Sequence, residues 1–257
     1  MPISYYYNFT YWVSSFYPKL AKFFQFVGEI KFIWVVISLI VLWFLVLFLT
    51  GFRGRSGHGL PFVMAIAGFS LMAIEIIILF GFQVFYGYLY YKIALIITFL
   101  MAGMALGSWL ANKNLVQKTI KSIIKIHLLI ILFSLVLLLG FYLLFKTEPK
   151  PSTLLEIIFL LIGGLIGAIV GFEFPIMNKL YLENIRLRPS GFGGQAKKVG
   201  TIYGADLIGS CLSASLISIF LLPIFGIYQT LIILGVLNFL IIISLTISRP
   251  LHQKPEP

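Results

Sequence analysis

The chain has 257 residues, of which 60% are hydrophobic and 11% are charged, and its formal net charge is +11. Soluble domains carry about 25% charged residues, so this composition excludes an ordinary soluble domain and indicates a chain that lies mostly in lipid. In an apolar chain the positive charge is a topology signal and an attraction to anionic headgroups, so no nucleic-acid partner is predicted.

Residues 1–30 are rich in aromatic side chains, beginning with the run YYYNFTYW, and Lys19 and Lys22 follow among phenylalanines. Because amphipathic rings prefer the headgroup zone, this segment is predicted to lie along the membrane interface. Docking onto a partner subunit is the alternative that the sequence leaves open. The segment has no basic start with an apolar stretch and a small-residue cleavage site, so it is not predicted to be a secretory signal.

Seven apolar runs follow, and a bilayer core about 30 Å thick requires roughly 20 residues per helix. Loops rich in glycine, aromatic residues or proline separate the runs, and Pro223 and Gly226 mark the last tight turn. The predicted fold class is therefore all-α: a polytopic membrane helix bundle of about seven transmembrane helices over residues 31–248, with a short polar tail at 249–257. The predicted spans are 31–51, 60–83, 89–111, 124–146, 154–178, 200–222 and 225–248.

Lysine and arginine residues orient this predicted bundle. Thirteen of them fall on one side and six on the other, and the positive-inside rule makes the richer side cytoplasmic. The prediction is a multi-pass protein of the inner cell membrane, with its N-terminus outside and its C-terminus in the cytoplasm. A re-entrant span, which would reverse the N-terminal assignment, is left open. The thirteen are Arg53, Arg55, Lys113, Lys118, Lys121, Lys125, Lys179, Arg186, Arg188, Lys197, Lys198, Arg249 and Lys254.

Small residues recur at four-residue spacing in the third, fifth and sixth runs, which is typical of grooves that let membrane helices approach closely. These three helices are therefore predicted to form the centre of the bundle, and a moving substrate gate is the alternative interpretation of the same spacing. The predicted packing residues are Gly103, Gly107, Gly163, Gly167, Gly171, Gly204 and Gly209.

Three acidic residues lie inside the apolar runs: Glu75, Glu173 and Asp206. An ionised carboxylate in hydrocarbon costs at least several kcal/mol, so each must be protonated, hydrogen-bonded or in contact with water. Glu173 and Asp206 are expected at similar depth, with Tyr203 beside them. The open interpretations are structural hydrogen bonds to Tyr203, Ser210, Asn178 or a loop base, a proton or cation pathway, and a ligand pocket.

Other classes of site find no support in the sequence. Of the three histidines, His58 and His252 lie in loops and His127 is placed at the cytoplasmic edge of the fourth run, so neither bis-histidine haem nor another cofactor is predicted. Cys211 is the one cysteine, which excludes an internal disulfide and a cysteine metal cluster, and no metal site is predicted. No catalytic motif is present, so the chain is not predicted to be an enzyme on its own.

Four segments together resemble a known family: GFSLMAIEIIILFGFQVFYGYLYYKI, FLMAGMALGSWLA, GGLIGAIVGFEFPIMNKLYL and VGTIYGADLIGSCLSASLISIFLLPIFGI. They are similar to the membrane region of the spermidine synthase-like membrane proteins, over about residues 66–230. The resemblance implies a transporter-like helix bundle, which in this family is often fused to an aminopropyltransferase-type domain. That domain's glycine loop and aspartate pair have no counterpart in this sequence, so no catalytic residue carries over, and polyamine chemistry is implied only by association.

Three functions remain open at this point. The first is a non-catalytic membrane subunit or anchor that docks a separately encoded enzyme or redox module, and its partners would be the bilayer and other protein subunits. The second is a proton- or cation-coupled transporter that uses the intramembrane carboxylates on a small cationic ligand. The third is a membrane enzyme that acts on a lipid-soluble substrate such as a quinone.

Overall fold

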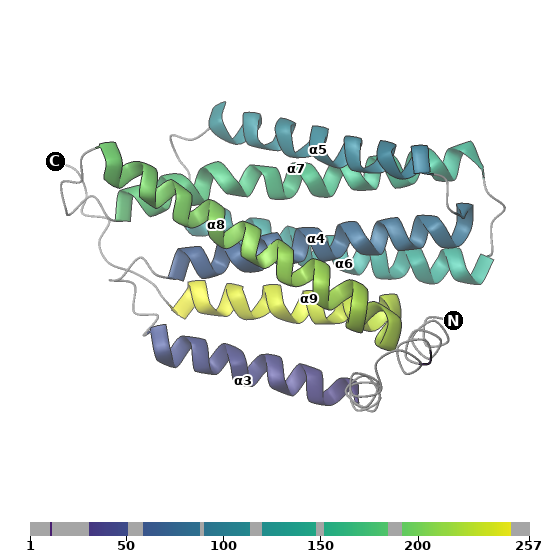
Figure 1. Ribbon diagram of the computed structural model, residues 1–257, viewed down its shortest axis with the longest axis horizontal. Helices are drawn as coiled ribbons and strands as arrows, with labels where there is room; N and C mark the ends of the chain where they lie inside the picture. Colours follow the sequence, from purple (N-terminus) through teal and green to yellow (C-terminus); the bar gives the residue numbers. More distant parts are fainter. Residues whose placement is uncertain are drawn as a thin grey trace.

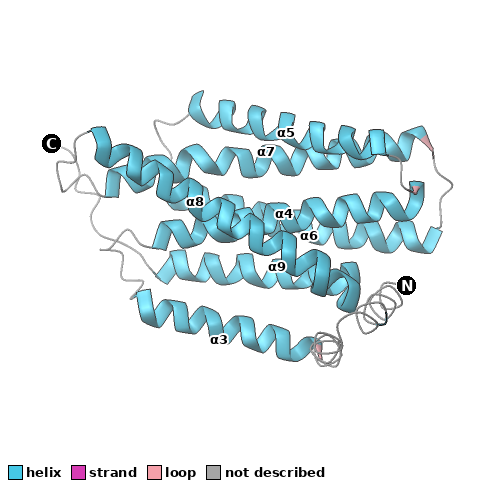
Figure 2. Cartoon of the chain, in the orientation of Figure 1, coloured by secondary structure: helices cyan, strands magenta, loops and turns pink. Residues whose placement is uncertain are grey.

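A computed structural model describes residues 11, 31–50, 59–87, 90–113, 120–147, 152–184 and 192–247 of the chain. This described part contains helices and no strand (Figure 2). The predicted interfacial segment at 1–30, apart from Tyr11, and the predicted tail at 249–257 lie outside the described residues.

A helix covers each predicted apolar run, because in lipid a helix satisfies its backbone polar groups within its own segment. The largest differences are that the fifth helix continues to Asn184 and the sixth begins at Phe192. The long axes of the helices run side by side, except that α8 crosses the others obliquely (Figure 1). The described elements are α3 (Phe32–Thr50), α4 (Gly59–Tyr86), α5 (Tyr90–Lys113), α6 (Ile120–Thr147), α7 (Thr153–Asn184), α8 (Phe192–Leu216), the π-helical η2 (Ile217–Leu221) and α9 (Leu222–Ile247).

Five helical stretches are long and apolar enough to cross a membrane, and the shorter apolar helix Phe32–Leu45 accompanies them. The fifth stretch, Ala196–Thr246, runs from α8 through η2 into α9 and reverses direction (Figure 1). The reversal lies at Gly226, whose φ of 78° and ψ of −179° are accepted almost solely by glycine. The all-helical fold and the apolar helices are thus those expected of a multi-pass membrane protein.

Helix α4 is the central element of the described bundle, and it packs against α6, α7, α8 and α9. Several side chains of α4, such as Val63, Ile74 and Phe82, are wholly inaccessible to solvent. The prediction that the third, fifth and sixth runs form the centre is wrong for the third, because α5 packs mainly on α7 and exposes Leu106 and Trp109. In this bundle the small residues of α5 and α7 indicate a close pair of helices. The large buried apolar residues of α4 indicate the central helix.

The contact between α5 and α7 is very close. Gly103 and Gly107 lie on α5, and Gly167 and Gly171 lie on α7. A Cβ atom added at any of these four glycines would overlap a backbone carbonyl oxygen of the opposite helix. The two backbones therefore touch directly, as in other small-residue pairs of membrane helices.

The other three predicted packing glycines differ in their surroundings. A Cβ at Gly209 would overlap the carbonyl oxygen of Ala65, so α8 touches α4 at this point. A Cβ at Gly163 would meet Ile96 at 3.5 Å, which is ordinary contact, and one at Gly204 would meet no atom within 4 Å. Gly204 therefore faces open space.

Helix α3 lies at the edge of the bundle, beside α9 (Figure 1). The indole nitrogen of Trp43 donates a 2.8 Å hydrogen bond to Oγ of Ser244, across 201 residues of sequence. Near the other end of α3, the rings of Phe32 and Phe225 meet edge to face. These contacts hold α3 against the last helix of the described chain.

Candidate functional site

A buried polar cluster joins α6, α9 and α4. His127 of α6 is wholly inaccessible, and its Nδ1 lies 2.8 Å from Oδ1 of Asn238 on α9. Nδ2 of Asn238 donates to Oγ of Ser70, at 2.8 Å, and to the carbonyl oxygen of Leu234, at 2.9 Å. Oγ of Ser70 in turn donates to the carbonyl oxygen of Ile66. This side of the cluster has a partner for every polar group.

The amide of Asn238 sets the tautomer of His127. Because both of its acceptor neighbours lie on the Nδ2 side, Oδ1 faces the histidine and can only accept. Nδ1 of His127 must therefore carry a proton. In a neutral ring the other nitrogen, Nε2, then presents its lone pair.

Glu173 of α7 faces that second nitrogen. Its Oε1 lies 3.4 Å from Nε2 of His127, and both side chains are completely buried. Neither Nε2 nor either oxygen of Glu173 has a hydrogen-bond partner within the described part of the chain. The lone pair on Nε2 of His127 thus points at the carboxyl group of Glu173. This contact becomes a hydrogen bond only when one of the two groups carries a proton between them.

The helix around Glu173 is locally altered. Pro175 lies inside α7 and has no N–H, so the carbonyl of Gly171 loses its usual helical donor. Nδ2 of Asn178 donates to the carbonyl oxygen of Phe174, at 3.1 Å, while its Oδ1 is buried without a partner. The irregular backbone therefore lies directly beside the buried carboxyl group.

Asp206 lies on α8, which packs against both α4 and α7. It is half-buried, and a Cβ added at Gly68 of α4 would overlap its Oδ1, so the absence of a side chain at Gly68 makes room for it. Ser210, one turn further along α8, donates to the carbonyl oxygen of Gly68 at 3.2 Å. Glu173 and Asp206 thus lie on two helices that pack against each other, and their predicted association stays a prediction.

Glu75 and Tyr203 do not join the cluster. Glu75 is half-buried on α4, and no hydrogen bond or ion pair links it to another described residue. Five residues along a helix amount to a rotation of about 140°, so Glu75 points away from the face that carries Ser70. Tyr203 is 52% exposed, and its ring packs edge-on against Phe174. No hydrogen bond among the described residues joins Tyr203 to the buried acids, so its predicted role in the site stays a prediction.

The structural partners proposed for the acids also differ from the prediction. Ser210 and Asn178 bond to backbone carbonyls, and the side chain that faces Glu173 is His127. Sequence reasoning missed His127, Ser70 and Asn238 as members of the site. A lone asparagine in the middle of the last apolar run was the available signal, since a buried amide requires polar company. No group of three metal-ligating side chains occurs among the described residues.

Comparison with known proteins gives one distant similarity. The chain is similar to a polyamine aminopropyltransferase of Leptospira interrogans serogroup Icterohaemorrhagiae serovar copenhageni (strain Fiocruz L1-130), with 27% identity over 166 residues. The match covers 63% of this chain and 30% of the relative, so the chain spans less than a third of that protein's length. No family model matches the chain, and no solved structure matches it significantly. The chain is thus a helical, apolar protein with a partial similarity to one spermidine synthase-like protein.

Proposed function

We propose that the chain is a multi-span membrane domain in which the His127–Glu173 pair binds and releases a proton during the transport of a small cation. The observation that carries this proposal is the buried 3.4 Å approach of Nε2 to Oε1, with no hydrogen-bond partner for either atom in the described structure. A purely structural cluster would satisfy its polar atoms, as the Asn238–Ser70 side does.

The proton count of the pair supports this role. With Nδ1 of His127 protonated by its contact with Asn238, a neutral ring and an ionised Glu173 would place a lone pair against a negative charge. One added proton, on either Nε2 or the carboxyl group, converts this repulsion into a hydrogen bond. The pair is therefore a site for one exchangeable proton.

Asp206 supplies the next position on a path for that proton. It is half-buried on α8, which packs against the helix that carries Glu173, so an ion arriving at Asp206 would change the balance of charge beside the buried pair. A cation near Asp206 favours loss of the proton from Glu173, and its departure favours return of the proton. This reciprocity is the coupling that an exchanger requires.

Polyamines are the proposed substrates, because of the similarity to the Leptospira protein. The relative is a polyamine aminopropyltransferase, and polyamines are small cations that suit an acidic site. Polyamine–proton exchange is therefore the form of transport to test first. The topology of the proposal is seven crossings, alternating in direction in Figure 1, with the lysine- and arginine-rich loops in the cytoplasm.

The test is proton movement in proteoliposomes that contain the purified chain and a trapped pH-sensitive dye. An inward gradient of spermidine should drive protons out in the wild type. Glu173→Gln should abolish this movement, because a glutamine amide does not ionise at the pH of the assay. Asp206→Asn should lower it by roughly tenfold or more, through loss of about 1.4 kcal/mol of coupling.

Glu156→Gln is the matched control, because Glu156 is a second half-buried acid of α7 that pairs with Lys92 at 2.6 Å, far from the cluster. This variant should transport like the wild type. Undiminished proton movement in Glu173→Gln would reject the proton-carrying role. A wild-type chain that moves protons with another cation, and not with spermidine, would reject only the substrate.

A second function is favoured by a different observation. The match leaves 70% of the relative unaccounted for, so the relative carries a large region beside the shared one. This supports a role for the present chain as a membrane subunit or anchor that docks a separate aminopropyltransferase-type enzyme. Isolation of the chain in mild detergent, followed by mass spectrometry, should then recover that enzyme in a fixed ratio, and a chain that is recovered alone would contradict the anchor.

A further inference from the structure

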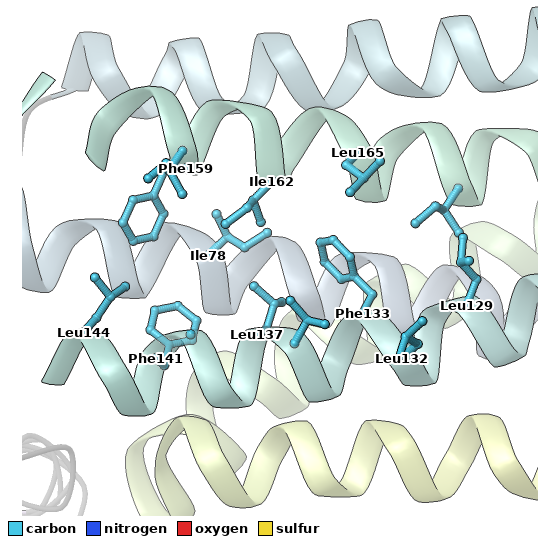
Figure 3. Close-up of a pocket in the computed structure, with 14 residues that line it drawn as sticks. Ile78, Leu129, Leu132, Phe133, Leu137, Phe141, Leu144, Phe159, Ile162 and Leu165 are labelled. Atoms are coloured by element: carbon cyan, nitrogen blue, oxygen red, sulfur yellow. The ribbon is translucent and has the colours of Figure 1, made fainter. Parts of the chain in front are cut away.

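An elongated pocket lies between α6 and α7, and its lining reaches Leu144 near the end of α6 and Ile158 near the start of α7 (Figure 3). Its volume is about 400 Å³, within the range of about 300–1,000 Å³ usual for ligand sites. Fourteen residues line it and none is polar. On α6 the lining runs from Leu129 to Leu144, a length of about 22 Å at the rise of an α-helix. The pocket is therefore a long apolar slot.

The slot has a closed floor and open sides. Ile78 of α4 and Phe141 of α6 are buried at its base, whereas Val136 on α6 and Leu165 on α7 are 60% and 57% exposed at its rim. Such a shape admits a narrow apolar chain from the side, through the lipid-facing surface. It contains no donor or acceptor that would orient a polar ligand within it.

Positive charge lies beyond one end of the slot. Lys125 precedes Leu129 by one helical turn, and Lys121 precedes Lys125 by another, so the three share one strip of α6. Both lysines are exposed, and neither forms an ion pair with a described residue. Basic positions at the end of an apolar groove between membrane helices are typical of sites for anionic lipid headgroups.

We infer that this slot is a binding site for one anionic phospholipid, with an acyl chain between α6 and α7 and its phosphate at Lys125 and Lys121. The length and apolar lining fit the chain, and the charge fits the headgroup. The slot contains none of His127, Glu173 and Asp206, so the inference is independent of the proposed transport.

Gly140 provides the sharpest test of the chain position. It lines the slot, and a Cβ added there would meet no atom within 4 Å, so a side chain can begin at this position without overlapping the surrounding protein. Gly235 on α9 is equally open but lies outside the slot. Gly140→Phe should therefore fill the binding site, while Gly235→Phe controls for the larger side chain.

Binding can be measured by native mass spectrometry of the purified full chain, titrated with palmitoyl-oleoyl phosphatidylglycerol or with phosphatidylcholine of the same chains. The wild type should bind one phosphatidylglycerol about tenfold more tightly than phosphatidylcholine. Gly140→Phe should weaken phosphatidylglycerol binding by roughly tenfold or more, and Gly235→Phe should not change it.

The headgroup position has a test of its own. Lys121→Gln with Lys125→Gln should remove most of the preference for phosphatidylglycerol, while leaving the weaker binding of phosphatidylcholine unchanged. Glycerol phosphate without acyl chains should not compete, because the phosphate alone lacks the slot. Competition by glycerol phosphate would mean that the lysines bind a free phosphate, and would overturn the lipid assignment.

Other outcomes would also overturn the inference. Equal affinity for the two lipids in the wild type would indicate bulk lipid contact, and unchanged binding in Gly140→Phe would place the lipid elsewhere. If Gly140→Phe unfolds, Val136→Phe replaces it, since Val136 is at the exposed rim and also lines the slot. Preserved lipid binding in that folded variant would equally reject the slot.

Discussion

Asn238 organises the buried cluster at the scale of single residues. It accepts from His127 and donates to Ser70 and Leu234, so one amide satisfies groups on three helices. Glu173, opposite it, has no such partner among the described residues. The cluster thus has a satisfied side and an unsatisfied side, and substitutions on the two sides should differ in sign.

On the satisfied side, Asn238→Leu should lower the stability of the protein in detergent by about 1–3 kcal/mol, because it leaves buried Nδ1 of His127 without an acceptor. Thermal unfolding followed by circular dichroism measures the change. An unchanged midpoint would show that water or lipid replaces the amide.

On the unsatisfied side, Glu173→Gln should leave the unfolding midpoint unchanged or raise it. The glutamine amide can donate to the lone pair on Nε2 of His127, and it removes a buried ionisable group that has no hydrogen bond. The same measurement on the same preparation as Asn238→Leu gives a direct contrast. A large loss of stability would indicate that Glu173 is a structural residue.

Sequence reasoning found the acids of this site and missed its histidine, for a physical reason. Glu173 and Asp206 are conspicuous because a carboxyl group in an apolar run is costly wherever it lies. His127 and Asn238 come together across 111 residues, and which faces of α6 and α9 meet depends on packing throughout the bundle. The spacing of residues within one helix does not show which faces of two distant helices will meet.

At the scale of elements, the glycines of α5 and α7 show which part of a small-residue pattern has structural meaning. Gly107 and Gly235 are both glycines in apolar helices, yet a Cβ at Gly107 would overlap the carbonyl of Ala168 and one at Gly235 would meet nothing. The spacing predicted close contact for α5 and α7 but also marked Gly204, which faces open space. A pattern on one helix does not identify the helix that will lie against it.

Gly107→Ala should therefore separate α5 from α7 and lower stability by about 1–3 kcal/mol. Gly235→Ala should be neutral or raise stability by up to about 1 kcal/mol, because alanine favours the helix. Thermal unfolding in detergent distinguishes the two, and equal effects would argue against a direct backbone contact between α5 and α7.

Gly226 is the second element-scale position with a clear expectation. At φ 78° and ψ −179°, an alanine costs about 1–3 kcal/mol of strain, and relief of that strain would straighten the turn between η2 and α9. Gly226→Ala should therefore lower the unfolding midpoint and increase cleavage by protease near this turn. Unaltered protease resistance would mean that the turn adapts to a side chain.

At the scale of the whole molecule, the apolar helices and the uneven distribution of lysine and arginine were readable from the sequence. Both depend on the solvent around the chain rather than on its internal packing. Most helix bounds were predicted to within about four residues, but α7 ends six residues later and α8 begins eight residues earlier than predicted. The central place of α4 was not readable, since it arises from contacts with four other helices.

The proposed topology can be tested with Cys211 replaced by alanine, which yields a cysteine-free chain in one step. Lys113 and Lys146 are exposed at the ends of α5 and α6, at opposite ends of the bundle (Figure 1). With a cytoplasmic α5–α6 loop, Lys146→Cys should react with a membrane-impermeant maleimide in intact cells. Lys113→Cys should react only after permeabilisation, and the reverse pattern would invert the topology.

The bond between Trp43 and Ser244 has a consequence for biosynthesis. Trp43 and Ser244 are 201 residues apart in the sequence, so α3 is synthesised well before the residue that accepts its hydrogen bond. This contact between α3 and α9 therefore forms late in biosynthesis. A chain truncated before Ser244 should leave Trp43 of α3 without this hydrogen-bond partner.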